Sequence, residues 1–173
     1  DSDEALKVIK RIYETLRNAA YTESVNLSKE RGAFKVFDWE KEKDNDYIKR
    51  LPEEIQNMIR EFGRRNISIL TNAPTGSVSI MSQTSSGLEP VFRNFYTRRR
   101  KLSHNEQELK PDFVDELGDK WLEYKVFHHN VREYLALFST EEIPDFFVES
   151  DQIDWPKRVD IQATIQKSID HSI

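Results

Sequence analysis

Cysteine is absent from the 173 residues of this sequence. Its absence excludes disulfide bonds and thiolate metal sites from this stretch of chain. Long apolar runs are missing too, because no segment approaches the roughly 18 consecutive apolar residues that a membrane-spanning helix needs. No charged segment followed by an apolar one opens the chain, so no secretory signal is predicted. We therefore expect a cytoplasmic protein that binds no membrane.

An excess of basic residues is missing as well. Lysine and arginine together number 26 against 31 aspartate and glutamate residues, which gives a formal net charge of −5. The chain is therefore not expected to bind nucleic acid, and a DNA- or RNA-binding module is the least favoured function class. Neither G-x-x-x-x-G-K-S/T nor G-x-G-x-x-G occurs, so the sequence supports neither a P-loop ATPase nor a dinucleotide-binding fold.

Helical periodicity is the main pattern that the sequence does contain. Ser2 can cap a helix whose first turn carries Asp3 and Glu4, and Pro52 precedes another segment with acids in its first turn. Apolar residues that recur every three or four positions extend these starts into helices. The predicted helices are at about 3–20, 22–31, 52–62, 119–138 and 156–171, and a strand–loop core is predicted at 66–92, with its strand at about 67–72.

The loop after the predicted strand is built from turn-forming and small hydroxyl residues, reading T-N-A-P-T-G-S over 71–77. Gly76 permits a positive φ and lets a ligand approach the main chain. Thr75 and Ser77 add hydroxyl donors, so an anion such as phosphate is the natural guest. Most loops of this composition bind nothing, and composition alone does not establish a site. The next residues, 78–81, read either as a second short strand or as the first turn of a helix, whose dipole would favour the anion.

Several stretches, read in order, resemble the adenosylcobalamin-dependent (class II) ribonucleotide reductases. Together they are far more specific than one glycine-containing loop. They are RRNISILT at 64–71, APTGS at 73–77, TSSGLEPVF at 84–92, Tyr96 with the basic run 98–101, VFHHNVREYL at 126–135 and IDWPKRVDIQATIQKSIDHSI at 153–173.

The resemblance implies an α/β fold. The full enzyme would be a ten-stranded α/β barrel, and residues 1–173 would form a single, mainly helical segment of that catalytic barrel with few β-strands. No initiator methionine opens the chain, and the last predicted helix runs into Ile173 without a stop signal. We therefore expect a carboxy-proximal fragment of the catalytic chain, excised from a longer reductase or produced by a split gene.

The resemblance also implies a reaction. The full enzyme would convert ribonucleoside di- or triphosphates to 2′-deoxyribonucleotides, with a cysteine thiyl radical initiated by adenosylcobalamin and a dithiol reductant. Because this chain has no cysteine, it cannot hold the complete active site, and it is expected to be inactive alone. No catalytic residue is assigned here. The cysteines are expected in the rest of the reductase chain or in a companion fragment.

The resemblance further implies that five residues of this chain form a cradle for the substrate phosphates. They are Pro74, Thr75, Gly76, Ser77 and Val78.

Two charged positions are secondary candidates. Glu89 reads either as a catalytic or hydrogen-bonding carboxylate near the substrate or as an ion-pair partner of Arg93 or Arg98, and the second interpretation is favoured. Arg98, with the rest of the basic run 98–101, could hold nucleotide phosphate or a cofactor tail. A solvated, charged strand end is the more common outcome for such a run.

The adjacent residues His128 and His129 predict no metal site. On a helix they would point about 100° apart and could not both bind one ion.

A function of a different class also fits the sequence. A non-catalytic nucleotide-binding or protein-interaction domain derived from a reductase would lack cysteine just as a fragment does. Whether the natural reading frame extends beyond this chain and contains cysteines separates the two.

Overall fold

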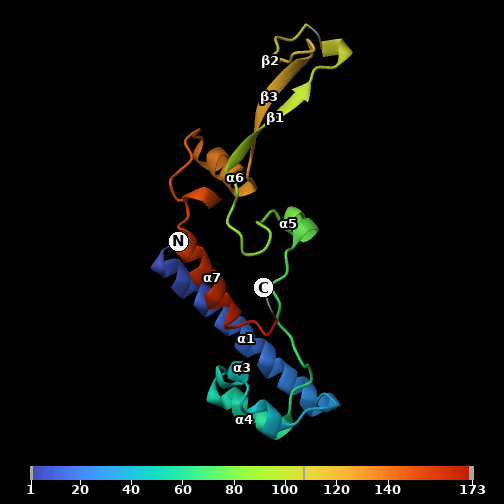
Figure 1. Cartoon of the computed structure of the whole chain (residues 1–173), viewed down its shortest axis with the longest axis vertical. Coiled ribbons are helices and arrows are strands. Elements are labelled where there is room, and N and C mark those ends of the chain that lie inside the picture. The colour runs from blue at the N-terminus through green and yellow to red at the C-terminus, as the bar shows by residue number, and fades with distance from the viewer. Residues whose placement is uncertain (1, 107, 172–173) are drawn as a thin grey trace. The chain divides into compact units, whose positions relative to one another are not determined.

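The computed structural model describes residues 2–106 and 108–171. The chain separates into two compact units, the first formed by Asp1–Pro74 with Ile153–Ile173 and the second by Thr75–Gln152. That residues 1–173 form one segment of the reductase catalytic barrel stays a prediction. Helices occupy much more of the described chain than strands do (Figure 1), which confirms the expectation of a mainly helical piece with few strands.

The first unit is built on α1 (Asp3–Arg31), a helix of 29 residues. Ser2 caps it by accepting a hydrogen bond from the amide of Ala5 at 3.1 Å, and Gly32 ends it with a φ of +80°. The predicted division into helices 3–20 and 22–31 is wrong. No glycine or proline lies between these stretches to break the backbone ladder, and Tyr21, at the predicted gap, is buried within the helix.

Three further helices close a core against the second half of α1 (Figure 1). They are α2 (Trp39–Glu42), α3 (Asp46–Lys49) and α4 (Glu53–Phe62). Pro52 precedes α4 and Gly63 ends it, which confirms the helix predicted at 52–62. The buried apolar side chains of this core are Tyr21, Val25, Ile48, Leu51, Ile55 and Ile59.

Helix α7 (Trp155–Gln166) runs alongside α1 (Figure 1), and the ammonium of Lys157 lies 2.6 Å from the carboxylate of Asp3. The helix predicted at 156–171 therefore exists, but it ends at Gln166. The residues that follow leave the helix because the carboxylate of Asp170 accepts hydrogen bonds from the backbone of Ile69 and Leu70.

The strand predicted at 67–72 is wrong, although its residues are β-branched and apolar in part. The amides of Ile69 and Leu70 both donate to the Asp170 carboxylate, at 2.8 and 2.9 Å. In a strand, successive amides point to opposite edges, so two neighbouring amides that converge on one carboxylate cannot belong to a ladder. No strand pairs with 67–72 in the part of the chain that the structure describes.

The second unit contains an antiparallel sheet with the strand order β1-β3-β2. Its strands are β1 (Phe95–Lys101), β2 (Phe113–Val114) and β3 (Lys120–Phe127). In the main pair, Phe95 lies opposite Phe127 and Lys101 opposite Trp121. The unit also contains helices α5 (Gly76–Ser82), η1 (His104–Glu106), α6 (His129–Phe138) and η2 (Ser150–Gln152).

The long helix predicted at 119–138 is wrong in its first half. Residues 120–127 form β3, and only α6 is helical. The helix was inferred from a broad set of apolar positions. Within that set, however, 122–126 reads L-E-Y-K-V, an alternation of apolar and charged residues that is typical of a strand with one face exposed. Pairing with β1 along residues 121–127 selects the strand.

Beyond β1, the chain turns through η1, and the carboxylate of Glu106 stabilises this turn. Glu106 accepts two hydrogen bonds from the guanidinium of Arg100, at 2.7 and 2.9 Å, and two from the amide and hydroxyl of Ser103. These donors favour the ionised carboxylate and lower the pKa of Glu106 to about 2, with Arg100 as the largest cause.

Ile59 provides the test of the core of the first unit, since its side chain is completely buried. Ile59→Ala should lower the free energy of unfolding by about 2–5 kcal/mol, because it removes buried methyl groups and leaves a cavity. Urea unfolding measures the loss. Val36→Ala is the control, because Val36 is 76% exposed and its truncation should change stability by about 0.5 kcal/mol or less. Equal effects of the two changes would contradict this core.

Glu106 provides a test of pH dependence. Its folded-state pKa of about 2 lies below the ordinary value of 4.5. The pairing therefore stabilises the fold above pH 4.5, and this stabilisation is lost as the pH falls toward 2. A carboxyl-¹³C NMR titration of the glutamate-labelled chain measures the pKa. Arg100→Gln should raise it, though not fully, because the Ser103 donors remain. A midpoint near 4.5 in the unaltered chain would exclude the pairing.

Candidate functional site

The phosphate-loop motif lies where α5 begins. Thr75 is the residue before the helix, Gly76 is its first residue, and Ser77 and Val78 lie in its first turn. Of the two structures that the sequence allowed for 78–81, the helix is therefore the one that forms. All residues from 74 to 78 are exposed. The first turn of an α-helix carries amides that have no acceptor within the helix, so this motif presents N–H groups to solvent.

Ser79 stabilises this helix start and was not singled out from the sequence. Its amide donates to the carbonyl of Thr75 at 2.6 Å, and its hydroxyl donates to the carbonyl of Gly76 at 2.7 Å. The side chain is buried, in contrast to its exposed neighbours Ser77 and Val78. A serine inside a short helix is an ordinary feature, so nothing in the sequence pattern marked it.

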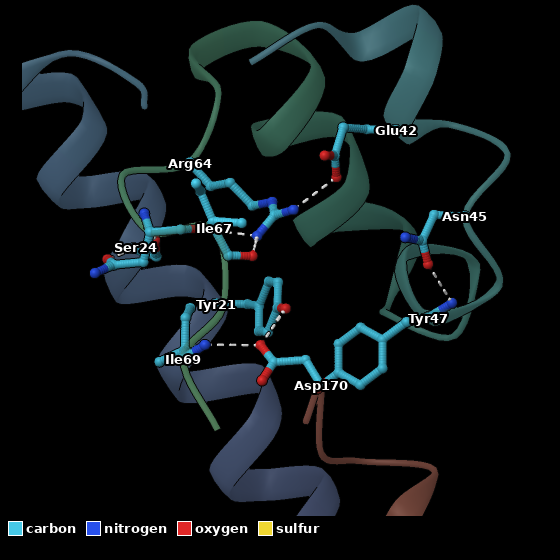
Figure 2. Close-up of polar contacts among 10 residues, drawn as sticks. Tyr21, Ser24, Glu42, Asn45, Tyr47, Arg64, Ile67, Ile69 and Asp170 are labelled. Atoms are coloured by element: carbon cyan, nitrogen blue, oxygen red, sulfur yellow. Dashed lines mark hydrogen bonds and ion pairs between the residues drawn. The ribbon is translucent and has the colours of Figure 1, made fainter. Parts of the chain in front are cut away.

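The segment that leads into the loop is held by two oppositely charged side chains (Figure 2). The guanidinium of Arg64 donates to the carbonyls of Asn66, at 2.8 Å, and Ile67. The carboxylate of Asp170 accepts from the amides of Ile69 and Leu70. The cation thus takes the carbonyl oxygens and the anion takes the amide hydrogens, as the donor and acceptor capacities of these groups require.

Both charged groups are themselves supported. Arg64 is buried, pairs with Glu42 at 2.8 Å and lies over the ring of Phe34 at 5.2 Å from its centroid. Asp170 accepts a further hydrogen bond from the hydroxyl of Tyr21 at 2.8 Å (Figure 2). Burial and then this bond to Asp170 raise the pKa of Tyr21, so the phenol keeps its proton and remains a donor.

In the second unit, the TSSGLEPVF segment lines a groove of about 560 Å³ together with Tyr96 and His128. Gly87, with a φ of +64°, lies so close under Glu89 that a side chain at this position would meet the carboxylate. A smaller groove of about 250 Å³ shares Thr84 and His128 with the first and is otherwise lined by residues of α5 and of 127–132. The structure therefore brings together three of the segments that carry the resemblance.

Glu89 forms no ion pair with Arg93, one of its two expected partners, in the described chain. Arg93 instead pairs with Glu149 at 2.6 Å and with Asp151 at 2.9 Å. Glu149 also accepts a hydrogen bond from the backbone amide of Asn94, the residue before β1, so the ion pair is anchored at the start of this strand. Among the described residues, Arg98 forms no ion pair with Glu89 either. The pairing interpretation of Glu89 is therefore wrong.

The basic run 98–101 is mostly neutralised by acids within its own unit. Arg99 pairs with Glu123 at 2.7 Å across the sheet, Arg100 pairs with Glu106, and Lys101 pairs with Asp119. Arg98 is the residue of the run that has no ion pair in the described part of the chain, and it lies opposite Tyr124. The run is thus largely a charge-paired strand, and Arg98 alone keeps an unneutralised charge.

The two adjacent histidines do not share a helix face. His128 precedes α6 and His129 is its first residue, where Nε2 of His129 lies 3.2 Å from the carboxylate of Glu133. Within residues 2–106 and 108–171, no group of three or more histidine, cysteine or acidic side chains is placed to hold a metal ion. The described helices also include none with the length and apolar character needed to span a membrane.

Comparison with known proteins identifies the family of the chain. The sequence pattern described as "Ribonucleotide reductase, barrel domain" matches residues 1–173. The vitamin B12-dependent ribonucleoside-diphosphate reductase of Mycobacterium tuberculosis is 34% identical over 98 residues, which are 57% of this chain and 12% of that protein.

Two relatives match over more of the chain. The vitamin B12-dependent ribonucleoside-diphosphate reductase of Thermoplasma acidophilum is 27% identical over 179 aligned residues, covering 100% of this chain and 21% of that protein. The ribonucleoside-diphosphate reductase large subunit of Plasmodium falciparum is 28% identical over 174 residues, covering 90% and 21%. The chain spans between 12% and 21% of the length of these three relatives. Because the family pattern covers every position of the sequence, this chain belongs to the ribonucleotide reductase barrel-domain family.

Proposed function

We propose that this chain holds the phosphates of a ribonucleotide within a ribonucleotide reductase, and that Pro74, Thr75, Gly76, Ser77 and Val78 form the cradle. One observation carries the proposal: α5 begins inside the motif, so its first-turn amides and the Ser77 hydroxyl are exposed together. Amides at a helix start favour anions through hydrogen bonding and through the local dipole.

The cradle would act by orientation. Its donors are backbone amides and hydroxyls. These groups do not ionise near neutral pH, so they bind the phosphate without transferring a proton to it and leave its charge intact. Fixing the phosphates restricts where the ribose can lie, and this positioning lowers the entropy cost of the chemical step. The residues of this chain would therefore contribute to substrate binding and alignment, while the bond-breaking groups are supplied from outside it.

Glu89 and Arg98 are proposed as secondary positions. Glu89 lines the groove beside Tyr96 and His128 and has neither of the arginine partners expected for it, so its carboxylate can accept hydrogen bonds from a ligand's hydroxyl groups. Arg98 retains a charge that is not neutralised by an ion pair in the described chain, and a guanidinium is well suited to phosphate.

We propose that the whole protein is a cytoplasmic enzyme that reduces ribonucleoside di- or triphosphates to 2′-deoxyribonucleotides. The family and the printed names of the relatives support this reaction. A radical-bearing cysteine and a dithiol reductant would act with the rest of the reductase chain or a companion fragment, because this chain contains no cysteine.

Adenosylcobalamin is the proposed cofactor, since two of the compared relatives are named as vitamin B12-dependent. The described residues do not fit it. The larger groove of the resembling segments, about 560 Å³, has the size of a site for a drug-like molecule, and a corrin macrocycle with its nucleotide tail is much larger. We therefore assign no cobalamin contact and no step of the cofactor's chemistry to this chain.

The alternative, a binding-only domain derived from a reductase, fits the same lack of cysteine equally well. It differs in predicting a natural protein that binds nucleotide without turnover.

The first experiment measures nucleotide reduction by the complete natural protein that carries this chain. Adenosylcobalamin, a dithiol and a ribonucleoside diphosphate are supplied, and the triphosphate is tested in parallel. We expect deoxynucleotide to form only when cobalamin is present. Nucleotide binding without turnover under all of these conditions would instead support the binding-only domain.

Ser77→Ala in the same protein tests the cradle. Loss of one hydrogen bond to a charged phosphate should raise KM roughly tenfold or more and change kcat little. Ser82→Ala is the matched control, because Ser82 lies in the last turn of α5 and its hydroxyl donates within the helix to the carbonyl of Val78. A collapsed kcat with unchanged KM for Ser77→Ala would refute the assignment.

A further inference from the structure

Asp170 connects the end of the described chain to the segment that enters the phosphate loop. Its Oδ2 accepts hydrogen bonds from the hydroxyl of Tyr21 and the amide of Ile69, both at 2.8 Å (Figure 2). Its Oδ1 accepts from the amide of Leu70 at 2.9 Å. The three donors come from α1 and from a segment about 100 residues earlier in the sequence. One side chain therefore fixes two consecutive peptide units.

A carboxylate is required for this arrangement. All three partners are donors, and an ionised aspartate is a group that only accepts. Tyr21 cannot become an acceptor by losing its proton, since burial and Asp170 both raise the pKa of its phenol. An asparagine of the same shape would turn an NH₂ group toward at least one of these donors. Asp170→Asn therefore removes at least one of the three hydrogen bonds and the negative charge without removing the packing.

Other contacts also hold residues 68–72 in place. The amide of His171 donates to the carbonyl of Leu70 at 3.2 Å, and the His171 ring lies 2.7 Å from the hydroxyl of Ser68. The hydroxyl of Tyr13, on α1, donates to the side chain of Asn72 at 3.0 Å. The chain is thus held up to Asn72, two residues before the cradle begins at Pro74.

We infer that Asp170 is a positioning residue for the phosphate cradle, with Tyr13 as its lesser partner at Asn72. This inference rests on the proposed function of residues 74–78. Asp170 does not touch the substrate. It removes conformational freedom from the peptide units that lead into the cradle, so less freedom is lost when phosphate binds. Proline at position 74 restricts the residue before it, which carries this ordering toward the loop.

The test uses the complete natural reductase and measures KM, kcat and thermal unfolding for three variants. Asp170→Asn should raise KM about tenfold and leave kcat within about threefold, as expected when ordering of a binding loop is lost. Tyr13→Phe, which removes one hydroxyl contact, should raise KM about two- to threefold.

Tyr47→Phe is the matched control. The Tyr47 hydroxyl donates to the carbonyl of Ser168 at 2.9 Å, so it anchors the same terminal segment, and it forms no hydrogen bond with 68–72 in the described chain. We expect it to lower the unfolding temperature and leave KM unchanged. The inference is overturned if Tyr47→Phe raises KM as much as Asp170→Asn does, or if folded Asp170→Asn protein keeps its KM. Should Asp170→Asn fail to fold, Tyr13→Phe against Tyr47→Phe makes the same comparison.

Ser77→Ala distinguishes a failure of the cradle assignment from a failure of the positioning role of Asp170. If Ser77→Ala leaves KM unchanged, the cradle assignment fails, and the inference fails with it. If Ser77→Ala raises KM and Asp170→Asn does not, the cradle stands and only the positioning role of Asp170 is lost.

Discussion

The backbone of residues 66–70 needs hydrogen-bond partners, and within the described chain two charged side chains, Arg64 and Asp170, provide most of them. Arg64 satisfies carbonyls and Asp170 satisfies amides. Ile69 and Leu70 are partly buried, and main-chain groups withdrawn from water must be paired, because an unsatisfied buried donor or acceptor costs its full desolvation free energy. This requirement explains why α7 stops at Gln166, why Tyr21 carries its hydroxyl into the core, and why the segment entering the loop is ordered without a neighbouring strand.

The same constraint relates stability to the proposed function. Arg64 is buried against Tyr21 and Phe34 and paired with Glu42, so the ordered segment is continuous with the core of the first unit. The proposed phosphate site itself contains no charged side chain. An acidic chain can hold an anion in this way, because amide dipoles and hydroxyls act over short distances and depend little on the net charge of the protein.

Features that depend on near neighbours in the sequence, such as helix ends, could be predicted well. Features that depend on distant residues, such as strand pairing, could not. Ser2, Pro52, Gly32 and Gly63 mark helix ends through rules that involve only near neighbours, and the structure has helix ends at these positions. The halves of 119–138 were merged because apolar residues satisfied a helical period, while the pairing of β3 with β1 depends on a strand about 25 residues away. The motif 74–78 was visible in sequence. Asp170 was not, because its partners lie about 100 residues earlier and an aspartate near a helix end is unremarkable by itself.

The pairing of the basic run has a consequence for the sheet edges. In the described chain, β1 has a sheet neighbour on one side only, and β2, at the other edge, is just two residues long. An unpaired strand edge is a template for adding a strand from another molecule. Three of the four consecutive cations of β1 are paired with acids of their own unit, and Arg98 has no ion pair in the described chain. A second β1 strand placed beside the open edge would bring further cations close to Arg98, so this charge disfavours growth of the sheet by edge addition.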